Sequence, residues 1–179
     1  MEPVTLETSR LLLRPWRLAD AADVLEYARD EEWSRFLHVP RPYTARDAEE
    51  FVARSLLHSW DTHPVWAIEV RSEGKAAGGI NIRIERDHAT AEVGYGIARW
   101  HWGQGYITEA CKAVFAWTFE TFGLAKIVAA ADAENVASWR VMEKLGMQRE
   151  AYLRSHRVLR GERRDEVRYG LLRDEFPRP

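Results

Sequence analysis

The sequence lacks most features that mark secreted, membrane-bound or nucleic-acid-binding proteins. Its 179 residues include a single cysteine, Cys111, so no internal disulfide can form and a reducing, cytoplasmic location is expected. No apolar run approaches the roughly 20 residues of a membrane helix, and the first residues lack the pattern of a signal peptide. A net charge of −2 gives no global basic field, so we expect neither a nucleic acid nor a membrane as partner.

The order of predicted elements indicates one α+β domain over residues 1–179. Alternating and continuous apolar patterns predict strands at 6–14, 65–70, 76–85, 91–97, 126–131, 149–159 and 163–172. Helices are predicted at 20–29, 44–59, 105–122 and 135–145; Asp20 caps the first, and Thr44 and Asp47 form a capping box for the second. The helix at 105–122 connects two strands as a βαβ crossover, so the sheet of about seven strands should be mixed and mostly antiparallel.

Two glycines, Gly103 and Gly105, lead directly into the strongest predicted helix. Glycine allows close approach of the backbone to a ligand, and the first amides of a helix have no intrahelical acceptor. Such amides, at the positive end of the helix dipole, form a phosphate-binding cradle. Glycines at a strand-to-helix junction are also common turn residues, so this motif alone leaves both interpretations open.

Four segments, in this order and spacing, resemble the GNAT superfamily of acyl-CoA N-acyltransferases, in the branch of ribosomal-protein N-terminal acetyltransferases of the RimJ and RimL type. The segments are Thr8-Ser9-Arg10-Leu11-Leu12-Leu13-Arg14, Ala91-Glu92-Val93-Gly94-Tyr95, Trp102-Gly103-Gln104-Gly105-Tyr106-Ile107-Thr108-Glu109-Ala110, and Asn135-Val136-Ala137-Ser138 with Glu143-Lys144-Leu145-Gly146-Met147. The resemblance covers almost the whole chain. It implies a GNAT fold with splayed central strands flanked by helices, acetyl-CoA as co-substrate, and no metal.

The resemblance also implies where acetyl-CoA binds. The implied binding residues are Val93, Tyr95, Ile97, Trp102, Gly103, Gln104, Gly105, Tyr106, Ile107, Thr108, Asn135 and Ser138. The pantetheine arm would lie between the strand at 93–97 and the strand at 127–131, where its amides mimic a missing strand. Trp100 stands where the superfamily usually has Gln or Arg, which affects a side-chain contact and not the backbone cradle.

The implied mechanism is direct attack of a neutral amine on the thioester, with backbone donors stabilising the oxyanion. In this mechanism Ser138 protonates the departing thiolate, although Asn135 and Ser138 also fit a plain helix cap and first turn. Glu92 is a candidate general base or a solvent-facing strand residue. Arg157 occupies the position of a carboxylate base in some relatives, and a guanidinium cannot take that proton. A water relay remains an alternative.

The acceptor is predicted to be a protein or peptide N-terminus. At pH 7 an α-amine, with a pKa of about 7.8, is neutral far more often than a lysine amine, with a pKa of about 10.4. The resemblance allows a ribosomal protein as partner and a homodimer as assembly. Trp33 and Tyr43 bound the expected acceptor lip. Residues 20–50 contain nine acidic and four basic residues, which attract a cationic acceptor or simply form a solvated face.

Three other functions fit parts of the sequence. The same chemistry on a small amine, such as a polyamine, an amino acid or an antibiotic, is the first alternative. A non-catalytic acyl-CoA-binding module is the second, prompted by Arg157. Nucleic-acid binding through the arginine-rich segment at 149–168 is the third and most remote.

Overall fold

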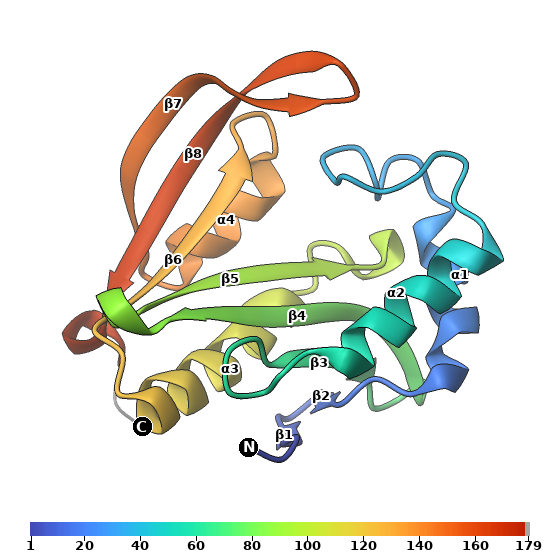
Figure 1. The fold of residues 1–179 in the computed structure, drawn as a ribbon, viewed down its shortest axis with the longest axis horizontal. Coiled ribbons are helices and arrows are strands. Elements are labelled where there is room, and N and C mark those ends of the chain that lie inside the picture. The colour runs from blue at the N-terminus through green and yellow to red at the C-terminus, as the bar shows by residue number, and fades with distance from the viewer. Residues whose placement is uncertain (178–179) are drawn as a thin grey trace.

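The structure, a computed structural model, describes residues 1–177 as eight strands in one sheet with four α-helices (Figure 1). The sheet order is β1-β2-β3-β4-β5-β6-β8-β7. The strands are β1 Leu6–Glu7, β2 Leu11–Arg14, β3 Val65–Val70, β4 Lys75–Glu85, β5 Thr90–Ile97, β6 Lys126–Asp132, β7 Gln148–Leu159 and β8 Glu162–Leu172. The helices are α1 Ala21–Ala28, α2 Ala45–Leu57, α3 Tyr106–Phe122 and α4 Val136–Lys144. Within residues 1–177 only β5 and β6 pair in parallel, which confirms the mixed, mostly antiparallel sheet.

Both faces of the sheet are covered. On one face, the predicted apolar stripe of α3, which includes Val114 and Phe115, packs with Ile68 of β3 in the larger core cluster. On the other face, α1 and α2 pack with Val65 and Ala67 of the same strand in a second cluster. Because β3 is buried on both sides, its continuous apolar run replaces the alternation of a half-exposed strand. No helix in residues 1–177 is both long and apolar enough to cross a membrane.

The predicted first strand at 6–14 is wrong in one respect, because it is two short strands that fold back on each other. Leu6 pairs with Leu13 in an antiparallel ladder, which raises the strand number from the predicted seven to eight. The turn is organised by Glu109 of α3, whose carboxylate accepts hydrogen bonds from the Thr8 hydroxyl at 2.6 Å and the Arg10 amide at 3.0 Å. A side chain from a distant helix therefore bends a segment that local pattern presents as one strand.

The predicted caps have different outcomes. Thr44 and Asp47 form the expected capping box at the start of α2. Asp20 precedes α1 without capping it, because its carboxylate binds the buried Arg14 guanidinium with two hydrogen bonds of 2.8 Å. Two charges buried together satisfy each other better than Asp20 would satisfy a helix end.

The central strands separate in the middle of the sheet, as predicted. β5 and β6 pair only at Thr90–Lys126, Ala91–Ile127 and Glu92–Val128. β5 continues to Ile97 with β4 on one side, while β6 continues to Asp132 with β8 on the other. From Val93 onward one edge of β5 therefore has no strand partner, and its backbone groups remain available to a ligand.

Candidate active site

The turn before α3 presents a series of free backbone donors. Within residues 1–177, none of the backbone N–H groups from Gly103 to Thr108 has a hydrogen-bond acceptor. Gly103 and Gly105 have φ values of 76° and 81°, the left-handed region that favours glycine. An ideal Cβ on Gly103 would meet no atom within 4 Å, so the backbone here faces open space. This arrangement fits a diphosphate at the start of a 17-residue helix.

Side chains stabilise this turn by donating hydrogen bonds to backbone carbonyls. The Trp102 indole donates to the Ile97 carbonyl at 2.9 Å, and the Gln104 amide donates to the Trp100 carbonyl at 2.9 Å. Arg10 donates to the Gln104 carbonyl at 2.9 Å and lies over the Tyr106 ring at 4.4 Å. The turn thus brings the predicted cofactor-binding residues together. Its backbone amides are free to bind a ligand, whereas the side chains of Trp102 and Gln104 are bonded to neighbouring carbonyls.

Arg10 and Glu109 are two residues whose role the sequence did not indicate. Their side chains form a two-point ion pair, with Nε and Nη2 of Arg10 at 2.7 and 2.6 Å from Glu109. Burial favours the neutral form of Glu109, but hydrogen bonds from Thr8, Ser9 and Arg10 outweigh it and keep its pKa below the ordinary value. The pair ties the β1–β2 turn to the start of α3 and so fixes the cradle.

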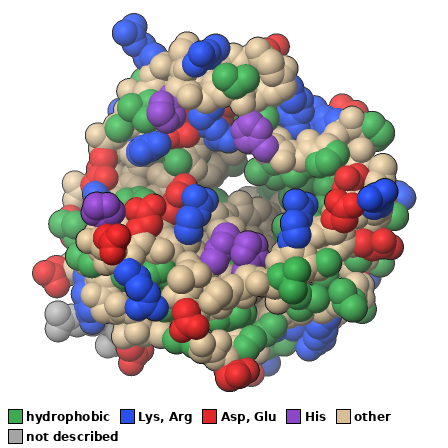
Figure 2. Space-filling model, in the orientation of Figure 1, with side chains coloured by type: hydrophobic (Ala, Val, Ile, Leu, Met, Phe, Trp, Pro, Cys, Tyr) green, Lys and Arg blue, Asp and Glu red, His purple; other side chains and the backbone are tan. Residues whose placement is uncertain are grey.

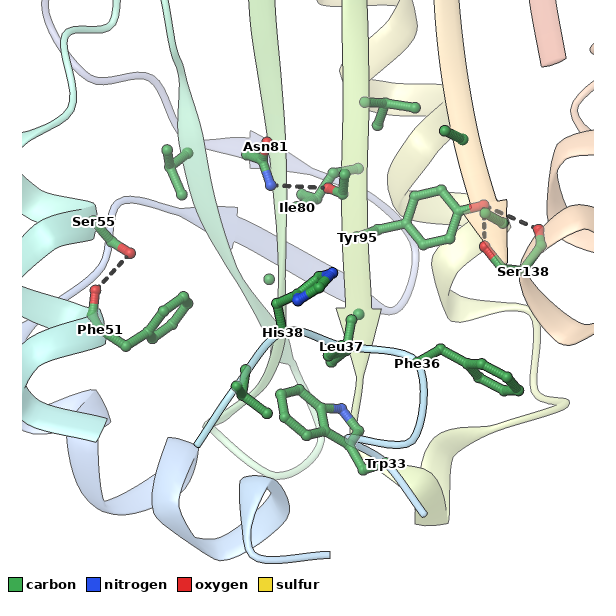
Figure 3. A pocket seen from close by; sticks show the side chains of 18 of the residues that line it. Trp33, Phe36, Leu37, His38, Phe51, Ser55, Ile80, Asn81, Tyr95 and Ser138 are labelled. Carbon is green, nitrogen blue, oxygen red and sulfur yellow. Dashed lines mark hydrogen bonds between the residues drawn. The ribbon is translucent and has the colours of Figure 1, made fainter. Parts of the chain in front are cut away.

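Hydroxyl groups bridge the gap between β5 and α4. Tyr95 donates to the Ser138 backbone carbonyl at 3.0 Å, and the Ser138 hydroxyl donates to the Tyr95 oxygen at 3.3 Å (Figure 3). Asn135 caps α4 by accepting the Ser138 amide at 3.3 Å, so the structural interpretation of this asparagine is confirmed. Burial raises the pKa of Tyr95, which therefore keeps its proton at neutral pH.

A cavity of about 550 Å³ opens beside this bridge. Its wall includes Tyr95 and Ser138, together with residues from β4, α1, α2 and the segment at 33–43. Trp33, Leu37 and His38 lie across the cavity from Ile80 and Asn81 (Figure 3). Besides Tyr95, the Trp, Tyr and Phe side chains in the wall are Trp16, Tyr27, Trp33, Phe36, Tyr43 and Phe51. Figure 2 shows His, Lys and Arg side chains around a central hollow of the molecule.

Trp33 and Tyr43, the predicted acceptor-binding residues, both line this cavity. Trp33 packs on Tyr27 with 5.0 Å between ring centroids. Burial and the charge of Asp47 raise the pKa of Tyr43 to about 12. None of the nine acidic residues at 20–50 belongs to the cavity wall. The structure therefore favours the solvated-face interpretation of those acids over an acidic acceptor lip.

A polar pair inside the cavity explains one of the glycines of β5. The His63 Nε2 atom lies 3.2 Å from the Asn81 amide oxygen, and Asn81 donates to the Gly94 carbonyl at 3.3 Å. A Cβ on Gly94 would lie only 2.8 Å from the Asn81 nitrogen, so glycine is needed for this carboxamide to cross the strand. Burial lowers the pKa of His63, and the imidazole is therefore neutral at pH 7.

Glu92, the predicted base, is placed less favourably. It lies opposite Arg83 in the β4–β5 ladder, with 3.7 Å between its carboxylate and the guanidinium. Asn81, Arg83 and Gly94 line the cavity, whereas Glu92 does not. Arg157, where a base was sought, does line it. Sequence reasoning did not identify His63 or Asn81 as site residues: His63 lies just before the predicted strand at 65–70, and Asn81 appears only as a polar position of the predicted strand at 76–85.

Free amides at a helix start, an open strand edge and an adjoining cavity fit a protein that binds a coenzyme beside a second ligand. A family model described as an acetyltransferase (GNAT) domain matches residues 10–148. The chain belongs to this family, and it is an N-acetyltransferase that uses acetyl-CoA. The family assignment excludes the non-catalytic alternative as the main interpretation.

Several known proteins are similar over nearly the whole chain. The uncharacterized N-acetyltransferase p20 of Bacillus licheniformis is 30% identical, covering 96% of this chain and 98% of the relative. A GNAT-family acetyltransferase structure from Bacillus anthracis has a TM-score of 0.86 at 28% identity, covering 96% of this chain and all of the other. The complex of the microcin C7 self immunity acetyltransferase MccE with acetyl-CoA and AMP has a TM-score of 0.84, covering 92% and 93% of the two chains. Its 18% identity shows the fold alone.

Proposed function

We propose that the acceptor is an α-amine at the N-terminus of a protein or peptide. The observation that carries this proposal is His63, held by Asn81 in the wall of a cavity whose lining offers no free carboxylate. An imidazole is a weak base, and it suits an amine that is often neutral at pH 7 already. A ribosomal protein as acceptor is supported by a putative ribosomal N-acetyltransferase, YdaF of Bacillus subtilis, which is 31% identical over 105 residues. The RimJ and RimL branch and a homodimer belong to the same proposal.

The proposed proton acceptor is His63, directly or through one water. Its Nε2 proton is directed to Asn81 in this tautomer, which leaves Nδ1 as the acceptor. The groups that face the ring are His58, with 4.1 Å between ring centroids, and Arg83 and Asn81 on β4. Burial, and then the charges of His58 and Arg83, lower the pKa of His63 and outweigh the hydrogen bond with Asn81, which raises it. Glu92 remains a second candidate.

The proposed proton donor is the hydroxyl pair of Ser138 and Tyr95. Ser138 would give its hydroxyl proton to the departing thiolate and regain one from solvent, while Tyr95, which accepts from this hydroxyl and donates to the Ser138 backbone carbonyl, holds it in place. The raised pKa of Tyr95 keeps the pair protonated while a thiolate forms beside it. Bound acetyl-CoA supplies the acetyl group as a thioester. The chain contributes the amides of Gly103 to Thr108 for its diphosphate and the open edge of β5 for its arm.

A small-molecule amine is the second candidate acceptor. The aromatic wall of the cavity favours it, since such a wall suits the apolar part of a compact ligand. An N(2)-transacetylase from Aspergillus fumigatus, named for FsC and acetyl coenzyme A, is also 27% identical and covers 97% of this chain and 78% of the relative.

The deciding experiment is an acceptor panel with acetyl-CoA, measured by intact mass and thiol release. The panel contains peptides with free N-termini, the same peptides with blocked N-termini and a free lysine, polyamines, amino acids and aminoglycosides. Turnover only on free N-termini supports the proposal. Turnover only on small amines moves the acceptor to the second candidate, and turnover on blocked lysine peptides contradicts both.

A further inference from the structure

The one carboxylate among the residues that line the acceptor cavity already binds an arginine. Among the residues that line it, Asp132 is the only carboxylate, and it is buried. Its two oxygens accept hydrogen bonds from Arg164 at 2.9 and 3.3 Å, and one also accepts the Glu134 amide at 2.9 Å. The wall therefore has no free negative charge with which to hold a second cationic group of an acceptor.

Arg157 of β7 is a cavity residue with unused donors. Its side chain is 25% exposed, and within residues 1–177 its guanidinium makes no hydrogen bond. The Glu166 carboxylate lies 3.7 Å from its Nε atom, which makes an ion pair without a hydrogen bond, and the other Glu166 oxygen accepts from Arg168 at 2.9 Å. A guanidinium carries five N–H donors in a plane, which a carboxylate matches with two parallel bonds.

Arg160, three residues further along the same hairpin, provides the contrast. Its guanidinium donates to the carbonyls of Ser34, Arg35 and Leu37 at 2.9 to 3.2 Å. The hairpin thus contacts the segment at 33–43 through Arg160, whereas the partly buried Arg157 has no hydrogen-bond partner within residues 1–177 and only the longer ion pair with Glu166. A charged group removed from water needs a partner to offset its lost hydration.

We infer that the acceptor carries a carboxylate, which pairs with Arg157 while its apolar part packs on the aromatic wall. This inference rests on the proposed acetylation of an α-amine and names its substrate class. The carboxylate belongs either to a free amino acid or to an acidic side chain near the N-terminus of a peptide. Polyamines and aminoglycosides, which carry only positive charges, are poor acceptors on this account.

The first test measures binding without turnover. N-acetylphenylalanine and N-acetylphenylalaninamide differ only in the carboxylate, and their dissociation constants are measured by calorimetry in the presence of coenzyme A. We expect the acid to bind at least about 10-fold more tightly than the amide, because a charge-assisted pair is lost with the carboxylate. Arg157→Gln should abolish this difference, and Arg157→Lys should retain part of it. Arg154→Gln, an exposed arginine of the same strand outside the cavity wall, is the matched control.

The second test identifies the source of the carboxylate. Acetylation rates are compared for free phenylalanine, phenylalaninamide, and peptides with Glu, Gln or Lys at the second position. Preference for the free acid indicates an amino acid, and preference for Glu over Gln indicates an acidic peptide.

The inference is overturned if the acid and amide bind equally, if neither binds at millimolar concentration, or if Arg157→Gln weakens both equally. The proposed function fails by a different result, the absence of α-amine acetylation while the binding preference persists.

Discussion

The coenzyme side of this enzyme presents mainly backbone groups, whereas the acceptor side presents mainly side chains. The coenzyme side consists of backbone: free amides from Gly103 to Thr108 and the unpaired edge of β5. The acceptor side consists of side chains that come from α1, α2, β4, β7 and the segment at 33–43.

This difference explains why one side can be recognised in a sequence and the other cannot. A backbone cradle needs glycines at fixed positions, and glycines with positive φ leave a local pattern. A cavity wall assembled from many separate elements needs only compatible shapes and charges. The family is therefore readable from the coenzyme side, whereas the acceptor must be determined by experiment.

The largest expected effect tests whether the coenzyme side is a backbone site. Gly105→Val should reduce acetyl-CoA affinity by about 100-fold or more, because a β-branched residue opposes the φ of 81° and displaces the free amides. Calorimetry measures the affinity. Gly123→Val, at the other end of α3 with a φ of 63°, introduces the same strain away from the cradle and should leave the affinity unchanged. An unchanged affinity in folded Gly105→Val would place the cradle elsewhere.

The second effect tests the proton acceptor on the acceptor side. His63→Gln should lower kcat/KM by about 100-fold. In the wild type, kcat/KM should fall as pH falls through the His63 pKa, which lies below the ordinary 6.5, because the protonated ring cannot accept. The variant should lose this acidic limb while the affinity for acetyl-CoA stays constant. If Glu92→Gln removes the limb instead, Glu92 is the base.

The third effect tests the bridge between the two sides. Ser138→Ala and Tyr95→Phe should each lower kcat by about 10-fold, and the double variant should lose little more, because the two hydroxyls act as one unit. Single-turnover rates with a leaving thiol of lower pKa sharpen the test, since such a thiol needs no protonation. Full turnover of both single variants across pH would contradict the donor role.

The smallest effect concerns the support of the cradle. Glu109→Gln should reduce the free energy of unfolding by about 2 kcal/mol at pH 7, since the Arg10 pair and the turn donors lose their charged acceptor. The pKa of Glu109 is held below its ordinary value, so its stabilising contribution is present above the unfolded pKa. It is lost as pH falls through the folded pKa, and the variant should show a flatter acid limb in chemical unfolding. Glu120→Gln, exposed on the same helix, is the control.

Most of the fold could be predicted because the relevant signals are local. The stripe of α3, the capping box of Thr44 and Asp47, and the apolar run of β3 follow from periodicities within single segments. The break of the first strand could not be predicted, because the residue that bends it, Glu109, is about a hundred positions away. Asp20 was assigned to a helix cap for a different reason: its partner Arg14 is only six positions away, but the local pattern does not show that both side chains are buried together.

The candidate site divides in the same way. Gly103, Gly105 and Ser138 carry family patterns, and the structure places them at the cradle and the bridge. His63 and Asn81 lie 18 positions apart, and only the pairing of strands brings them together. Gly94 was an indirect signal of this pair, because its missing Cβ makes room for the carboxamide of Asn81.

The bond between the Trp102 indole and the Ile97 carbonyl has a practical consequence. It fixes a natural fluorophore, 43% exposed, between the cradle and the end of β5. Trp60 and Trp66, in contrast, are buried and contact each other, so we expect their emission to change little when the coenzyme binds. The emission of Trp102 therefore provides an internal optical probe of coenzyme binding, and a Trp102→Phe variant supplies the baseline against which each substitution above can be titrated without a label.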